Sequence, residues 1–139
     1  MYISTLVKKA NRLLVKEANE LLKKHGLADG YTYFLMALYH QEGLTQSEIR
    51  KQIGIEQSTA VRTLDRMERD GLIIRKPSQT DRRAVTIHLS EKAKQYEKII
   101  EQCSKLLNKH ALMNFSELEK ESMNTLLEKF IHNLESAKK

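Results

Sequence analysis

The chain of 139 residues has one cysteine, one proline and five glycines, and each scarcity excludes something. A single cysteine, Cys103, cannot form an intrachain disulfide, which fits a reducing cytoplasm. Residues 1–5 do not start a secretory signal, and no run of about 18 apolar residues is present to span a membrane. Because helix breakers are so few, we expect a mainly helical protein, and the length suits one domain. The single cysteine and the lack of a signal or membrane segment predict a cytoplasmic location.

Residue patterns that support catalysis or metal binding are also missing. The sequence has no glycine-rich phosphate loop, no G-x-S-x-G motif and no convincing pair of catalytic carboxylates, so we expect no enzyme and no cofactor. No two histidines are spaced four residues apart on a helix, which argues against a local metal site. The five are scattered along the chain: His25, His40, His88, His110 and His132.

The chain has a formal net charge of +6, and its arginines are concentrated in one region. Seven of the eight arginines lie within residues 44–90, and only Arg12 lies outside. The guanidinium group suits phosphate oxygens and guanine edges, whereas lysine is a general solubilising residue. The middle third is therefore the candidate functional region, although a solvated arginine-rich helix face would show the same bias.

Apolar spacing and glycines predict four helices before residue 72. Apolar residues recur every three or four positions over residues 3–22, 31–41, 46–53 and 57–70. Gly26, Gly43, Gly54 and Gly71 follow these segments, as glycine commonly does after a helix. The third helix opens with a capping box, Thr45 to Glu48.

The pattern changes after Gly71. Residues 72–76 and 84–89 read as strands, and residues 77–81, with the only proline, read as the turn between them. Ser90 then caps a helix whose apolar positions, from Ala93 to His110, suit a helix–helix contact. A second capping box, Ser116 to Glu119, opens a last helix. The predicted fold is mainly α with a small β-hairpin, a winged helix-turn-helix flanked by terminal helices.

Two sets of polar residues are candidates for DNA contacts. A helix of this arrangement enters the major groove, and Arg62 is the best candidate to read guanine. An arginine on a stiff hairpin tip can enter the minor groove, and Asp81 could hold its guanidinium by a bidentate pair. The candidates on the helix are Gln57, Ser58, Thr59, Arg62, Thr63 and Arg66, and those on the hairpin are Arg75, Lys76, Asp81, Arg82 and Arg83.

These segments resemble one known family. The chain resembles the MarR (multiple antibiotic resistance regulator) family of transcriptional regulators in four segments: residues 44–49, the run Gln57 to Ile73, the tip Asp81-Arg82-Arg83 and the run Leu89 to Ala93. The motif of an aspartate, an arginine two residues later, and Leu-Ser eight residues after the aspartate is fairly specific. One departure is Val61, which stands where the family commonly has threonine.

The resemblance implies a homodimer that binds a pseudo-palindromic site in double-stranded DNA and represses transcription. Residues 1–28 and 91–139 would form the dimer, residues 31–90 the winged helix-turn-helix, and residues 72–89 the wing. It also implies recognition by Ser58, Thr59 and Arg62 and insertion of Arg83 into the minor groove. Effectors of this family often bind between the dimer helices and the winged part.

Three alternatives stay open at this point. The aromatic residues Tyr31, Tyr33, Phe34 and Tyr39 either line a pocket for a small aromatic or amphipathic effector or are core packing. Cys103 is either a redox sensor or an inert small apolar residue. The whole chain could instead be a protein-interaction module without DNA, or a winged-helix sensor of another family.

Overall fold

A computed structural model describes residues 1–137. The chain divides into two compact units, the first Met1–Lys105 and the second beginning at Leu106. Each unit is described by itself. Unit 1 contains helices α1 (Ile3–Leu22), α2 (Asp29–His40), α3 (Gln46–Ile53), α4 (Gln57–Arg69) and α5 (Glu91–Gln95), a 3-10 turn η1 (Lys23–His25), and strands β1 (Leu44–Thr45), β2 (Ile73–Pro77) and β3 (Val85–Leu89). Helix α6 (Glu97–Ala111) crosses the boundary, and α7 (Glu117–Ser136) lies in unit 2.

The sheet has one strand more than the predicted hairpin. β2 and β3 pair antiparallel as expected, and β1 adds to the other side of β3, with Leu44 opposite Ile87. A strand of two residues is too short to give a periodic signal. The predicted turn also began one residue early, because Pro77 closes β2 opposite Val85. Proline lacks a donor N–H, and β2 is an edge strand, where this causes no loss.

The helix predicted after Ser90 is interrupted at Tyr96, which separates α5 from α6. The Tyr96 amide donates to the Ala93 carbonyl, three residues back, at 3.1 Å. This tight turn ends α5, and the Tyr96 carbonyl then accepts from the amide of Ile100. The predicted positions from Ala93 to Leu107 are buried or partly buried, whereas His110 is exposed, and they are divided between two helices rather than one.

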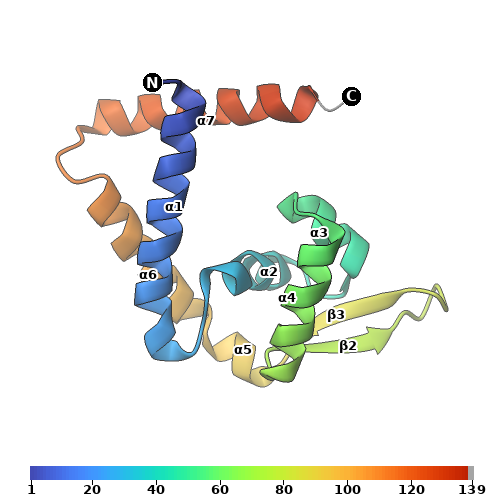
Figure 1. The fold of residues 1–139 in the computed structure, drawn as a ribbon. Helices are drawn as coiled ribbons and strands as arrows, with labels where there is room; N and C mark the ends of the chain where they lie inside the picture. The colour runs from blue at the N-terminus through green and yellow to red at the C-terminus, as the bar shows by residue number, and fades with distance from the viewer. Residues whose placement is uncertain (138–139) are drawn as a thin grey trace. The chain divides into compact units, whose positions relative to one another are not determined.

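The core of unit 1 fixes the orientation of α4. Leu38 of α2, Ile49 of α3, Leu64 and Met67 of α4, and Ile87 of β3 are each at most 1% exposed. These buried side chains come from three helices and the sheet, and those elements contact one another. Figure 1 shows how α2, α3 and α4 are arranged beside the β2–β3 hairpin. The same figure shows the β2–β3 hairpin projecting away from these helices as a wing.

The turn between α3 and α4 depends on Gly54. Its φ of 76° is in the left-handed region, and its amide donates to the Arg50 carbonyl at 2.8 Å. A side chain is strained in this conformation, so glycine is the natural residue here. The α3–turn–α4 unit is the predicted helix-turn-helix.

Unit 2 consists of the end of α6 and helix α7. The predicted capping box is present: the Glu119 amide donates to Ser116 Oγ at 3.1 Å, and the Ser116 amide donates to Glu119 Oε1 at 2.9 Å. None of the residues of α7 is buried. Over residues 1–137, no helix is long and apolar enough to cross a membrane, and no group of three or more side chains could hold a metal ion.

Candidate nucleic-acid interface

Helix α4 has two distinct faces. Ala60, Leu64 and Met67 are fully buried against the rest of unit 1. All six candidate residues lie on the remaining surface of the helix. Thr63 is partly exposed, and the other five are exposed, namely Gln57, Ser58, Thr59, Arg62 and Arg66. The core thus presents the candidate residues to solvent on one rigid helix.

The N-terminus of α4 differs from that of α3 in its capping. The Thr45 hydroxyl caps α3 by accepting from the Glu48 amide at 3.1 Å. Glu56, the residue at the same position of α4, makes no side-chain capping hydrogen bond. The first-turn amides of α4 therefore keep their hydrogen-bonding capacity for solvent or for an anion such as a phosphate.

The wing tip is a folded turn with exposed arginines. The Ser78 hydroxyl oxygen accepts from the amides of Thr80 and Asp81, each at 3.2 Å. Asp81 Oδ1 accepts from the backbone amide of Arg83 at 3.0 Å, so the carboxylate shapes the turn rather than holding the guanidinium group in the bidentate pair we expected. The side chains of Arg82 and Arg83 remain exposed.

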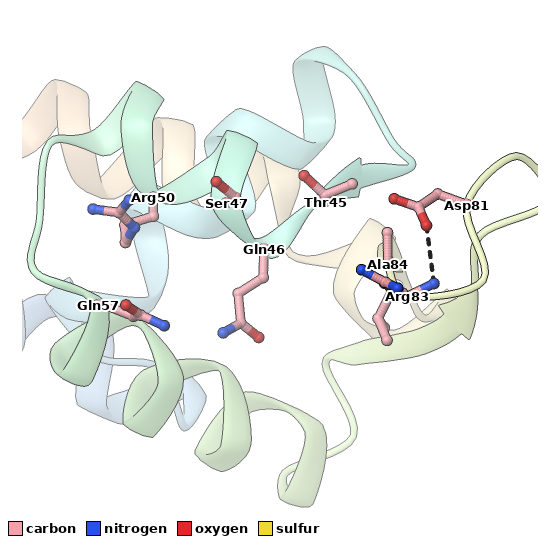
Figure 2. A pocket seen from close by; sticks show the side chains of 9 residues that line it. Thr45, Gln46, Ser47, Arg50, Gln57, Asp81, Arg83 and Ala84 are labelled. Carbon is pink, nitrogen blue, oxygen red and sulfur yellow. Dashed lines mark hydrogen bonds between the residues drawn. The ribbon is translucent and has the colours of Figure 1, made fainter.

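A surface hollow of about 600 Å³ joins α3, the start of α4 and the wing. Figure 2 shows Gln46 extending from α3 toward α4, with Arg83 on the wing side of the hollow. Two arginines, two hydroxyls and two amides give it the chemistry of a phosphate-binding surface. Its lining residues are Thr45, Gln46, Ser47, Arg50, Gln57, Asp81, Arg83, Ala84 and Val85.

Six of these lining residues were not among the candidates from the sequence, and three of the six, Gln46, Ser47 and Arg50, are polar residues of α3. A signal was available, because Arg50 belongs to the arginine-rich middle segment and Gln46 precedes it by four residues, on the same helix face. Their proximity to the wing depends on the tertiary fold.

Arg75, a candidate for DNA contact, has partners within the protein. Its Nη1 lies 2.9 Å from Asp65 Oδ1 and 3.0 Å from Glu68 Oε1, and only 20% of its side chain is exposed. Both carboxylates belong to α4, whereas Arg75 belongs to β2. The ion pairs therefore join the wing to the candidate recognition helix.

The C-terminal end of α4 is also fixed by polar contacts. The Tyr31 hydroxyl of α2 donates to Asp70 Oδ2 at 2.7 Å, and Arg69 Nε donates to Asp70 Oδ1 at 3.1 Å. The hydrogen bond from Arg69, followed by that from Tyr31, lowers the pKa of the Asp70 carboxyl. Burial, together with the hydrogen bond and negative charge of Asp70, raises the pKa of Tyr31. The hydrogen bonds from Arg69 of α4 and Tyr31 of α2 therefore favour the ionised form of Asp70.

Comparison with known proteins gives the same architecture. Residues 25–84 match the model of the MarR family. The transcriptional regulator SlyA superposes with a TM-score of 0.90 at 25% identity, over 99% of this chain and 96% of that one. A MarR family regulator from Listeria monocytogenes, complexed with a 26mer DNA, gives 0.86 at 25% identity, over 96% and 89%. Reduced AbfR bound to DNA gives 0.83 at 18% identity, over 99% and 92%.

By the family model over residues 25–84 and by fold over nearly its whole length, the chain is similar to the MarR family of winged-helix transcriptional regulators. The resemblance inferred from the sequence is confirmed, as is the predicted fold of a helical protein with a small sheet. MarR-family regulators are not enzymes, in agreement with the expectation from the sequence, and they are typically dimeric.

The four aromatic residues of the candidate effector pocket have different surroundings. Phe34 is 2% exposed in the core of unit 1, whereas Tyr33 is 51% exposed. The Tyr39 hydroxyl donates to the Ala93 carbonyl, and Tyr31 bonds to Asp70 as described. Phe34 therefore has a packing role, and a pocket made by the group stays a prediction. Cys103 is partly buried, with its Sγ 3.9 Å from the Leu21 carbonyl oxygen of α1.

Proposed function

We propose that the protein binds a pseudo-palindromic operator in double-stranded DNA as a homodimer and represses transcription. Helix α4 would enter the major groove, with Arg62 on a guanine, and Arg83 of the wing would enter the minor groove. The observation that carries the proposal is the hollow that Arg50 of α3, Gln57 at the start of α4 and Arg83 of the wing line together. A wing and a recognition helix that share one polar surface can contact a single DNA duplex together.

Two further observations support the DNA-binding mode. The uncapped N-terminus of α4 suits a phosphate, since its free amides and the helix dipole both favour an anion. The listerial relative of 25% identity was solved with a 26mer DNA, which is long enough for two half-sites one helical turn apart.

The homodimer is supported by apolar residues that the single chain leaves exposed. In α1, Ile3, Leu6 and Leu13 are more than half exposed, and in α7 the same holds for Leu126 and Leu134. Exposed apolar surface of this kind marks an interaction site. A second copy of the chain would cover it, in keeping with the dimers typical of the family.

The proposal includes release of the DNA by a small aromatic or amphipathic effector. Such a ligand lowers DNA affinity only if it binds the free protein more tightly than the complex. Titration of the protein–operator complex with small aromatic compounds, followed by fluorescence anisotropy, measures this directly.

The first experiment is selection from a randomised duplex pool by the full-length protein at moderate salt. We expect an inverted repeat with half-sites about 10 base pairs apart. With that duplex, log K should fall linearly with log salt, with a slope of about −0.9 for each phosphate neutralised. An unenriched pool and a flat salt response would contradict the proposal and favour a protein-interaction module.

Arg83→Ala then tests the role of the wing. It should cost about 1–3 kcal/mol of operator binding while the dimer stays intact. Arg12→Ala is the matched control, because it removes the same side chain from α1, outside the arginine-rich segment. Undiminished affinity of Arg83→Ala would remove the wing from the proposal.

A further inference from the structure

One apolar side chain lies on the polar surface of the recognition helix. Val61 is partly exposed and lines a shallow hollow of about 690 Å³ together with Gln57, Ser58 and Arg62. Gln57 and Ser58 precede Val61 by four and three positions, so the three residues share a face of α4. Arg62 directly follows Val61. Val61 is the only apolar residue among the four.

The core does not account for this valine. The residues that α4 buries are Ala60, Leu64 and Met67, and Val61, which is partly exposed, is not among them. Valine is also a poorer helix former than alanine, because its branched side chain is restricted in a helix. Neither packing nor helix propensity therefore favours Val61 at this position.

The chemistry of the major groove offers one group that valine can recognise. Base edges present hydrogen-bond donors and acceptors, and the C5-methyl group of thymine is the apolar exception. Valine can neither donate nor accept a hydrogen bond. A valine that enters the groove between polar residues can therefore favour only thymine.

We propose that Val61 is a specificity-determining residue that selects a thymine in each half-site by contact with its C5-methyl group. The inference rests on the proposed function, in which α4 enters the major groove. Arg62 is the next residue, and neighbouring Cα atoms lie about 3.8 Å apart, close to the rise of about 3.4 Å between base pairs. We therefore expect the thymine within about two base pairs of the guanine bound by Arg62.

The test replaces a single methyl group in the DNA. In the inverted repeat recovered by selection, each thymine of the half-sites is replaced in turn by deoxyuridine, which lacks only the C5-methyl group. At the position read by Val61, we expect affinity to fall about fourfold for one half-site and roughly 15-fold for both, as for one or two buried methyl groups. Deoxyuridine at a thymine outside the half-sites is the matched control.

Protein variants assign the effect to Val61. Val61→Ala removes both methyl groups from a partly exposed site and introduces a better helix former, so the fold is retained. This variant should bind the thymine and deoxyuridine duplexes equally. Val61→Thr keeps the branched shape and one methyl group and should retain part of the discrimination. Circular dichroism and thermal unfolding confirm that each variant is folded.

The outcomes separate the inference from the proposed function. Thymine discrimination that is present in the wild-type protein and lost in Val61→Ala supports the inference. A selected inverted repeat with no deoxyuridine-sensitive thymine, or a sensitivity that Val61→Ala leaves unchanged, overturns it while the DNA-binding function stands. Failure to select any sequence overturns the proposed function, and the inference fails with it.

Discussion

The winged part of unit 1 and helix α7 use their apolar residues in opposite ways. In the winged part, Leu64, Met67 and Ile87 are fully buried. In α7, Leu126 is 63% exposed and Ile131 is 52% exposed, and no residue of that helix is buried. Both regions have helical apolar spacing in the sequence, but only the first buries its apolar side chains fully.

This difference shows which part of the protein is complete by itself. The core of the winged part positions α4 and the sheet without help from another molecule. The apolar side of α7 gains little from folding of a single chain, because Leu126, Ile131 and Leu134 are each more than half exposed. The stability of the winged part and the affinity of the dimer should therefore respond to different substitutions.

The largest effect is expected from a charge placed on the apolar side of α7. In a symmetric dimer, one substitution removes two side chains from the interface. Leu126→Asp should therefore weaken dimerisation by about 3–6 kcal/mol, the value of two buried leucines. Sedimentation equilibrium measures the dissociation constant. Thr125→Asp adds the same charge to the other side of the helix and should leave the dimer unchanged; equal effects of the two would refute an interface on this face.

A truncation in the core of the winged part should act on folding instead. Leu64→Ala leaves a cavity beside Met67 and Ile49 and should lower the free energy of unfolding by about 2–5 kcal/mol. Urea unfolding at several protein concentrations separates this loss from any change in dimerisation. A loss below 1 kcal/mol would mean that Leu64 is not part of a closely packed core.

Sequence reasoning succeeded where the signal is local. The capping boxes at Thr45 and Ser116 are present, because they involve only residues three positions apart. Likewise, the helical spacing from Ile3 to Leu22 and the glycine turn at Gly54 were sufficient to predict α1 and the helix-turn-helix.

The misses involve contacts between distant segments. Strand β1 exists only because Leu44 meets Ile87, more than 40 positions later in the chain. The ion pairs of Arg75 with carboxylates on α4 are likewise not apparent from spacing, whereas the predicted contact of Arg75 with DNA stays a prediction. In the same way, the location of Arg50 near Arg83 follows from the packing of α3 against the sheet.

A smaller effect separates internal from DNA-facing charges within the winged part. Arg75→Ala should lower stability by about 1 kcal/mol, since it removes two partly exposed ion pairs. It should weaken operator binding through the position of the wing, without changing the salt slope. Lys76→Ala, at the exposed neighbouring position, should reduce the slope by about 0.9 if the side chain contacts a phosphate. A reduced slope in Arg75→Ala would restore Arg75 as a direct DNA contact.

The smallest effect tests the hydrogen bond from Tyr39 of α2 to the Ala93 carbonyl of α5. Burial, with a further contribution from the negative charge of Glu97, raises the pKa of Tyr39 to about 12 from its ordinary value near 10. Between these values, the unfolded chain has lost the phenol proton while the folded protein keeps it, so stability falls as pH rises from about 10 to 12. Because Tyr39 is partly exposed, we expect a loss of about 1 kcal/mol from this residue over that range.

Tyr39→Phe loses the hydrogen bond to Ala93 but has no proton to titrate, so it should be less stable near neutral pH and show a shallower decline in alkali. Thermal unfolding of both proteins across this range measures the two slopes, and parallel curves would show that Tyr39 titrates no differently in the folded and unfolded states.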